Sequence, residues 1–175
     1  MRKITTLDPK SLIVLVTGAT SGFGQAVCRR FAGAGAKVVA TGRRAARLAA
    51  LKKELGACCH TAVLDVRDRK ETEAVIAGLP KAFSKLNVVV ANAGLALGLE
   101  PAHQANLDDW EAMVETNIKG VLYTVRAALP GMVARDEGHV VLVGSVAADY
   151  PYPGGNVYGA TKAFVKQFAL NLRAD

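Results

Sequence analysis

The chain has 175 residues with a formal net charge of +7, and 51% of its side chains are apolar. This composition excludes an intrinsically disordered chain, and the length suits one domain with a substantial core. No apolar stretch approaches the roughly 18 residues of a membrane-spanning helix, and the N-terminus does not resemble a signal peptide. Three cysteines without CxxC spacing, Cys28, Cys58 and Cys59, indicate free thiols, so a cytoplasmic location is expected.

The excess of basic residues is concentrated between Arg29 and Lys70. Basic chains can bind nucleic acid, but this segment lacks the interleaved aromatic side chains of a strand-binding surface. Solvated helix faces are one interpretation of most of these charges, and binding of a compact phosphate-bearing ligand is the alternative for two of them. The three histidines have no metal-ligand companions at useful spacing. We therefore expect no nucleic-acid partner, no membrane partner and no metal.

Short apolar runs alternate along the chain with longer segments of helical spacing. The expected strands are residues 12–17, 37–41, 60–64, 87–91 and 139–144, and the expected helices are residues 24–34, 44–55, 68–79, 107–135 and about 157 to the end. The first run is uninterrupted and rich in β-branched residues, which is typical of a strand buried on both faces. The alternation predicts an α/β fold, a Rossmann-type doubly wound parallel sheet with helices on both faces, in a single domain over residues 1–175.

The longest expected helix, residues 107–135, carries its own boundary signals. Asn106 and Asp108 provide N-cap side chains at its start. Pro130, followed by Gly131, should bend or shorten its last turn.

A glycine-rich loop directly follows the first expected strand. In a dinucleotide site Gly18 allows the tight turn, Gly22 admits the pyrophosphate to the backbone, and Gly24 lets the helix pack closely. The P-loop motif is excluded because Gln25 stands where that motif requires Lys. An ordinary strand–helix turn is the alternative. The candidate cofactor-binding residues of this loop are Gly18, Thr20, Ser21, Gly22, Phe23 and Gly24.

Two arginines follow the second expected strand. NAD sites place an acidic residue there to bind the adenine-side ribose, but here Gly42 is followed by Arg43 and Arg44. A guanidinium can bind a 2′-phosphate through paired hydrogen bonds, so NADP(H) rather than NAD(H) is predicted. Arg44 could equally be a solvated residue in the first turn of a helix.

Tyr158 and Lys162 lie four residues apart, and hence on one face of a helix. An ammonium one turn away favours the phenolate, which brings a phenol with an ordinary pKa of about 10 closer to acid–base work. Ser145 should close the fifth strand, and Asn92-Ala93-Gly94 closes the fourth. All these groups are expected at the carboxyl edge of the sheet, where parallel sheets bind ligands.

Taken together, these motifs make the chain resemble a short-chain dehydrogenase/reductase. The matching motifs, in order, are TGATSGFG (17–24), Asp65-Val66, ANAG (91–94), Asn117, Ser145 and YGATK (158–162). Ala91 is the one departure, since Asn is commoner there. The resemblance covers nearly the whole chain.

The resemblance implies a role for each matching residue. Tyr158 would donate and accept the proton, Lys162 would lower the tyrosine pKa and bind the nicotinamide ribose, and Ser145 would orient the substrate carbonyl. Asn117 would hold a water that links Lys162 to solvent. The adenine would lie beside Asp65 and Val66, and the cofactor beside Asn92, Ala93 and Gly94.

Two stretches, residues 94–103 and 150–173, resemble the NADP-dependent 3-hydroxy acid dehydrogenases, which act on serine-like and 3-hydroxypropionate-like substrates or reduce malonic semialdehyde. A homo-oligomer, usually a tetramer, is implied. Members of this family continue through further C-terminal strands, so we expect that this chain is a truncated version that stops at Asp175. The alternatives are a non-catalytic NADP-binding or scaffold protein and, less well supported, an epimerase-like relative with a different glycine spacing.

Overall fold

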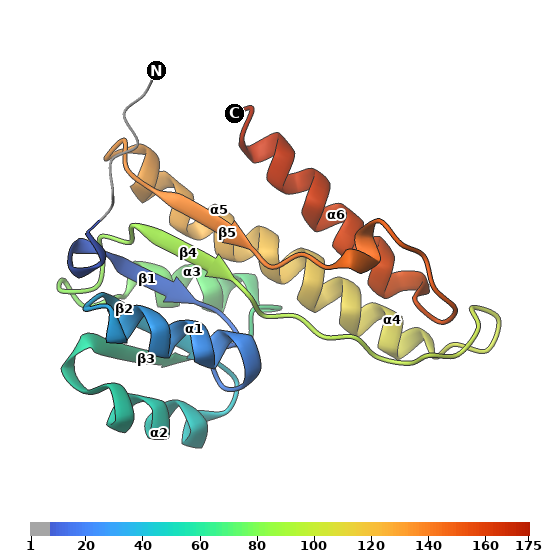
Figure 1. Ribbon diagram of the computed structural model, residues 1–175, viewed down its shortest axis with the longest axis horizontal. Helices are drawn as coiled ribbons and strands as arrows, with labels where there is room; N and C mark the ends of the chain where they lie inside the picture. Colours follow the sequence, from blue (N-terminus) through green and yellow to red (C-terminus); the bar gives the residue numbers. More distant parts are fainter. Residues whose placement is uncertain (1–7) are drawn as a thin grey trace.

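The computed structural model describes residues 8–175 and contains one parallel sheet of five strands in the order β3-β2-β1-β4-β5 (Figure 1). The strands are β1 (Ile13–Val16), β2 (Lys37–Gly42), β3 (Cys59–Val63), β4 (Val88–Ala91) and β5 (His139–Leu142). Val14 of β1 pairs with Val38 on one side and with Val88 on the other. The predicted doubly wound α/β fold is confirmed, with β1 at the centre of the sheet.

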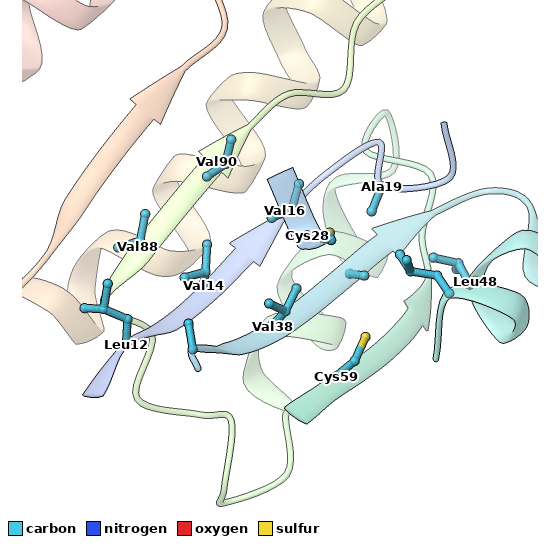
Figure 2. Packing of buried hydrophobic residues seen from close by; sticks show 13 residues of the cluster. Leu12, Val14, Val16, Ala19, Cys28, Val38, Leu48, Cys59, Val88 and Val90 are labelled. Carbon is cyan, nitrogen blue, oxygen red and sulfur yellow. The ribbon is translucent and has the colours of Figure 1, made fainter. Parts of the chain in front are cut away.

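Helices pack on both faces of this sheet, and alternate residues of β1 point to opposite faces, so each face has its own apolar cluster. The helices are α1 (Gly22–Gly33), α2 (Ala45–Leu55), α3 (Arg69–Ala77), α4 (Leu107–Val114), α5 (Gly120–Val133) and α6 (Asn156–Leu172). Figure 2 shows Val14 and Val16 in the cluster that also contains Cys28 of α1 and Leu48 of α2. Leu15 points to the opposite face and belongs to a cluster that includes Met132 of α5.

The helical segment expected at residues 107–135 is confirmed, but a turn of π-helix at Glu115–Lys119 divides it into α4 and α5. The Asn106 side chain caps α4 by accepting a hydrogen bond from the Asp108 N–H at 2.9 Å, as predicted. Pro130 lies inside α5, which continues past it to Val133. The larger irregularity is therefore the π turn, which the sequence did not indicate.

The three cysteines are free thiols, as predicted. Burial raises the pKa of Cys28 to about 12 and that of Cys59 to about 11. Because the thiolate is the reactive form, these two side chains are unreactive core residues at neutral pH.

Residues 8–175 contain no helix that is both long and apolar enough to cross a membrane. Over the same residues, His, Cys, Asp and Glu nowhere gather in a group of three or more that could hold a metal ion.

Candidate active site

A cleft of about 570 Å³ lies where the loops after the five strands meet α6. Fourteen of the seventeen predicted site residues line it: Gly18, Thr20, Ser21, Gly22, Phe23, Arg43, Arg44, Asp65, Val66, Asn92, Ala93, Gly94, Tyr158 and Lys162. The three that do not are Gly24, Asn117 and Ser145. The expected convergence at the carboxyl edge of the sheet is thus largely confirmed.

The glycine loop is locked to the segment after β4. Asn92 Nδ2 donates to the Thr17 carbonyl at 2.8 Å, and Thr17 Oγ1 accepts from the backbone N–H groups of Asn92 and Ala93. Gly18 has φ +66°, and a Cβ there would lie 2.9 Å from Asn92 Nδ2. At Gly24 a Cβ would lie 2.5 Å from the same atom and from the Gly18 carbonyl oxygen. The close approach at Gly24 is therefore to the glycine loop and to Asn92.

Arg44 reaches across to the hydroxyl groups of this loop. Its Nε and Nη2 donate to Thr20 Oγ1 at 2.9 and 2.6 Å, and Nη2 also donates to Ser21 Oγ at 2.7 Å. Ser21 is the N-cap residue of α1, yet its side chain makes no capping hydrogen bond. Over residues 8–175 the exposed Arg43 side chain forms no hydrogen bond with the protein. The two arginines thus differ. Arg44 is hydrogen-bonded to the glycine loop, whereas the Arg43 guanidinium can bind an anion.

Asp65 enters the cleft already paired with Arg67, which sequence reasoning missed. Arg67 Nη2 donates to Asp65 Oδ2 at 2.6 Å, and Arg67 Nε lies 3.0 Å from both carboxylate oxygens. The hydrogen bonds from Arg67 hold the pKa of Asp65 below its usual value. Asp65 is therefore an ionised acceptor whose charge is largely balanced before any ligand binds.

Lys162 is a buried cation, only 7% exposed, beside the half-buried Tyr158. Its Nζ donates to the Val143 carbonyl oxygen at 2.8 Å and lies 5.9 Å from the centroid of the Tyr158 ring. Burial lowers the pKa of Lys162. No carboxylate of residues 8–175 forms a salt bridge with it. The positive charge of Lys162 is therefore available to groups in the cleft.

Asn117 lies in the π turn and is 1% exposed. Its Oδ1 accepts from the Leu95 N–H at 2.9 Å, while Nδ2 donates to the Leu95 carbonyl at 2.8 Å and to Thr161 Oγ1 at 3.1 Å. A Cβ at Gly94 would lie 3.3 Å from Asn117 Oδ1 and 3.5 Å from Lys162 Nζ. The Asn117 amide therefore ties the segment after β4 to α6 directly behind the cleft.

Replacing Asn117 with Ala is expected to lower the free energy of unfolding by about 2–4 kcal/mol, because the buried Thr161 hydroxyl and the half-buried Leu95 backbone lose hydrogen bonds. Urea unfolding measures this loss. Asn117→Asp, which keeps the acceptor for the Leu95 N–H but loses both donors, serves as the comparison. Unchanged stability of Asn117→Ala would contradict the bridging role of this side chain.

Ser145 departs from its expected position. The fifth strand ends at Leu142, and Ser145 begins the short 3-10 turn Val146–Ala148, where its Oγ accepts from the Ala147 N–H at 3.2 Å. Strand pairing ends early because β5 is bonded only to β4, whose own last residue is Ala91. Ser145 directly follows Gly144, which lines the cleft. Across residues 8–175 no hydrogen bond joins the hydroxyls of Ser145 and Tyr158.

The cleft also contains residues that the motifs did not single out: Gly42, Leu64, Leu95, Ala96, Thr116, Val143 and Gly144. Most of them directly flank a motif at a strand end, so the rule that ligands bind at the carboxyl ends of strands could have identified them. Thr116 comes from the π turn and had no such signal.

Comparison with known proteins agrees with this geometry. The family model for short chain dehydrogenase matches residues 12–175. The chain is 60% identical to the NADP-dependent 3-hydroxy acid dehydrogenase YdfG of Salmonella typhi over 164 residues, and 53% identical to the serine 3-dehydrogenase of Rhizobium radiobacter over 162 residues. These matches cover 94% and 93% of this chain, and 66% and 65% of the relatives.

A structure of serine dehydrogenase in a closed form, complexed with NADP⁺, superposes with a TM-score of 0.93 at 58% identity. It is matched over 94% of this chain and 66% of its own. A short chain dehydrogenase/reductase from Burkholderia phymatum, in complex with NAD, gives a TM-score of 0.90 at 28% identity and is matched over 95% of this chain and 60% of its own. The chain thus spans between 60% and 66% of the length of these relatives. On its motifs, its fold and these matches, the chain belongs to the short chain dehydrogenase family.

Proposed function

We propose that this protein is an NADP(H)-dependent oxidoreductase that transfers a hydride between nicotinamide and the hydroxyl or carbonyl carbon of a small 3-hydroxy acid. A single cleft is lined by the glycine loop, by Arg43, and by Tyr158 with Lys162, and this arrangement supports the proposal. Phosphate-binding and acid–base groups are therefore within reach of one extended ligand. The relatives named for NADP-dependent 3-hydroxy acid and serine dehydrogenases support this substrate class.

The cleft fits a dinucleotide. The uncapped start of α1 offers free N–H groups and the positive end of the helix dipole to a pyrophosphate. Arg43 would bind the 2′-phosphate, and Asp65 and Val66 would lie beside the adenine. When bound, NADP(H) supplies the hydride donor or acceptor.

The proton would move at the Tyr158 hydroxyl. In the reducing direction the phenol gives its proton to the substrate oxygen, and in oxidation the phenolate takes that proton back. The Lys162 ammonium would stabilise the negative charge that develops on the Tyr158 oxygen, and it would also bind the nicotinamide ribose. Ser145 would orient the substrate oxygen through a hydrogen bond.

The position of Asn117 adds a structural role to the proposed one. Both amide hydrogens of its side chain are engaged, with Leu95 and Thr161. We therefore propose that the Asn117 side chain holds the segment after β4, which lines the cleft, against α6. A water that links Lys162 to solvent would need another acceptor, such as a backbone carbonyl, or the second lone pair of Oδ1.

Steady-state reduction of NADP⁺ in the presence of serine or 3-hydroxypropionate tests the proposed activity. Substrate-dependent formation of NADPH is the expected result. Calorimetric binding of NADP⁺ without turnover on any 3-hydroxy acid would instead favour a non-catalytic nucleotide-binding protein.

Cofactor preference is expected to reverse in Arg43→Asp. A carboxylate at this position would repel the 2′-phosphate and could accept hydrogen bonds from the ribose of NAD(H). We expect at least about a tenfold loss of NADP⁺ affinity, equivalent to one charge-assisted hydrogen bond, with NAD⁺ affinity retained or improved. Calorimetric titration of both nucleotides measures the ratio, and an unchanged ratio would refute the role of Arg43.

The homo-oligomer expected from the family resemblance, and a tetramer in particular, stays a prediction. Sedimentation velocity on the purified protein tests it. A single species with the mass of one chain would contradict it.

A further inference from the structure

The contacts of Arg44 raise the question of why an N-cap serine leaves its helix uncapped. Ser is among the preferred N-cap residues because its hydroxyl accepts a hydrogen bond from a backbone N–H in the first turn. Ser21 occupies that position in α1 with an extended backbone, φ −169° and ψ 172°, yet makes no such bond. Its Oγ instead accepts a hydrogen bond from Arg44 Nη2 at 2.7 Å. The capping group is therefore held by a side chain from another loop.

The same guanidinium also fixes the preceding residue. Arg44 Nε and Nη2 both donate to Thr20 Oγ1, and Thr20 is only 6% exposed. Gly42 lies against this threonine, since a Cβ at Gly42 would come 2.8 Å from Thr20 Cγ2. The end of β2 and the glycine loop are thus joined by packing and by three hydrogen bonds from a single arginine.

We propose that Arg44 is a positioning residue that keeps the dinucleotide site open: it holds the Ser21 hydroxyl away from the first turn of α1 and so leaves the helix N–H groups free for pyrophosphate. This inference rests on the proposed function and deepens it. It also gives the two arginines different roles. Arg43 binds the 2′-phosphate, whereas Arg44 positions the loop that binds the pyrophosphate. Pyrophosphate is common to NADP(H) and NAD(H), so Arg44 acts on the binding of both.

Removing the guanidinium fork has two consequences. The Thr20–Ser21 segment loses its tether, so binding must order it. The freed Ser21 hydroxyl can then cap α1 and compete with the pyrophosphate for the same N–H groups. A lysine keeps the positive charge but lacks the planar fork that reaches two hydroxyl groups at once. Arg44→Lys should therefore behave like Arg44→Ala.

Calorimetric titration of each variant with NADP⁺ and with NAD⁺ tests the proposal, after thermal melts confirm that the variants fold. Arg44→Ala and Arg44→Lys are expected to weaken both nucleotides by a similar factor of about ten. Arg43→Ala should weaken NADP⁺ alone. The matched control is Arg47→Ala, which removes an exposed guanidinium from α2 whose single bond to the Thr20 carbonyl is 3.4 Å long; both affinities should stay within about twofold, as for an exposed charge.

A second substitution tests the capping step directly. In the Arg44→Ala background, Ser21→Ala removes the competing hydroxyl and should restore NAD⁺ affinity by about fivefold, the equivalent of one helix cap. In the otherwise unchanged protein Ser21→Ala should bring no gain. A loss in Arg44→Ala that is confined to NADP⁺, or the absence of any recovery, would overturn the inference while leaving the proposed function intact. Failure of the unsubstituted protein to bind either nucleotide would contradict both.

Discussion

Tyr158→Phe is expected to lower kcat for NADP⁺ reduction by about 10² to 10⁴-fold, the usual contribution of a positioned proton donor and acceptor. The ring, its packing and the neighbouring Lys162 all remain, so only the hydroxyl is lost. NADP⁺ affinity should therefore change little. Steady-state kinetics together with calorimetric titration separates the two effects.

Tyr152→Phe is the matched control for this substitution. Tyr152 belongs to the loop before α6 but does not line the cleft, and its side chain packs against Gly155. The Tyr152→Phe variant should therefore keep the kcat of the unsubstituted protein. Near-full turnover by Tyr158→Phe would remove the proposed mechanism, whatever the control shows.

Lys162→Met should lower kcat by about 10²-fold, because the negative charge that develops on the Tyr158 oxygen during the reaction loses the adjacent ammonium that stabilises it. Met has a similar length and no charge, so the buried site no longer bears the cost of desolvating an ammonium. That gain offsets the hydrogen bond lost at the Val143 carbonyl, and the free energy of unfolding should stay within about 1 kcal/mol. Urea unfolding and steady-state kinetics on the same preparation test both statements.

The effect of Lys162 should also depend on pH. Burial lowers the pKa of this lysine, so its ammonium is present below that pKa and is lost as the pH rises through it. The rate ratio between the unsubstituted protein and Lys162→Met in the oxidising direction should therefore shrink at alkaline pH. A ratio that stays constant across the alkaline range would show that Lys162 acts by some means other than its charge.

The strand pattern could be predicted because the sheet is buried on both faces. Four consecutive apolar residues, Ile13–Val16, predict a parallel strand that is buried on both faces. The end of β5 was harder to place, because the apolar run of residues 139–144 extends beyond the register that β4 provides. Local apolar character does not reveal where a neighbouring strand stops.

The site could be predicted wherever chemistry is tied to a strand end or to helical spacing. The glycine loop and the pair Tyr158 and Lys162 are of this kind. The bonds of Arg44 to Thr20 and Ser21 could not be predicted, because they join segments that are adjacent only after β1 and β2 pair. The hydrogen bonds of Asn117 to Leu95 and Thr161 likewise depend on a π turn, for which the sequence carries no periodic signal.

We expect a phosphorylated dinucleotide to extend along one cleft, from the Arg43 guanidinium to the hydroxyl of Tyr158. A crystal structure of the protein grown with NADP⁺ should show the 2′-phosphate on Arg43, the pyrophosphate at the first turn of α1, and the nicotinamide ring beside Tyr158. A nicotinamide bound away from Tyr158, or a tyrosine hydroxyl directed out of the cleft, would contradict it.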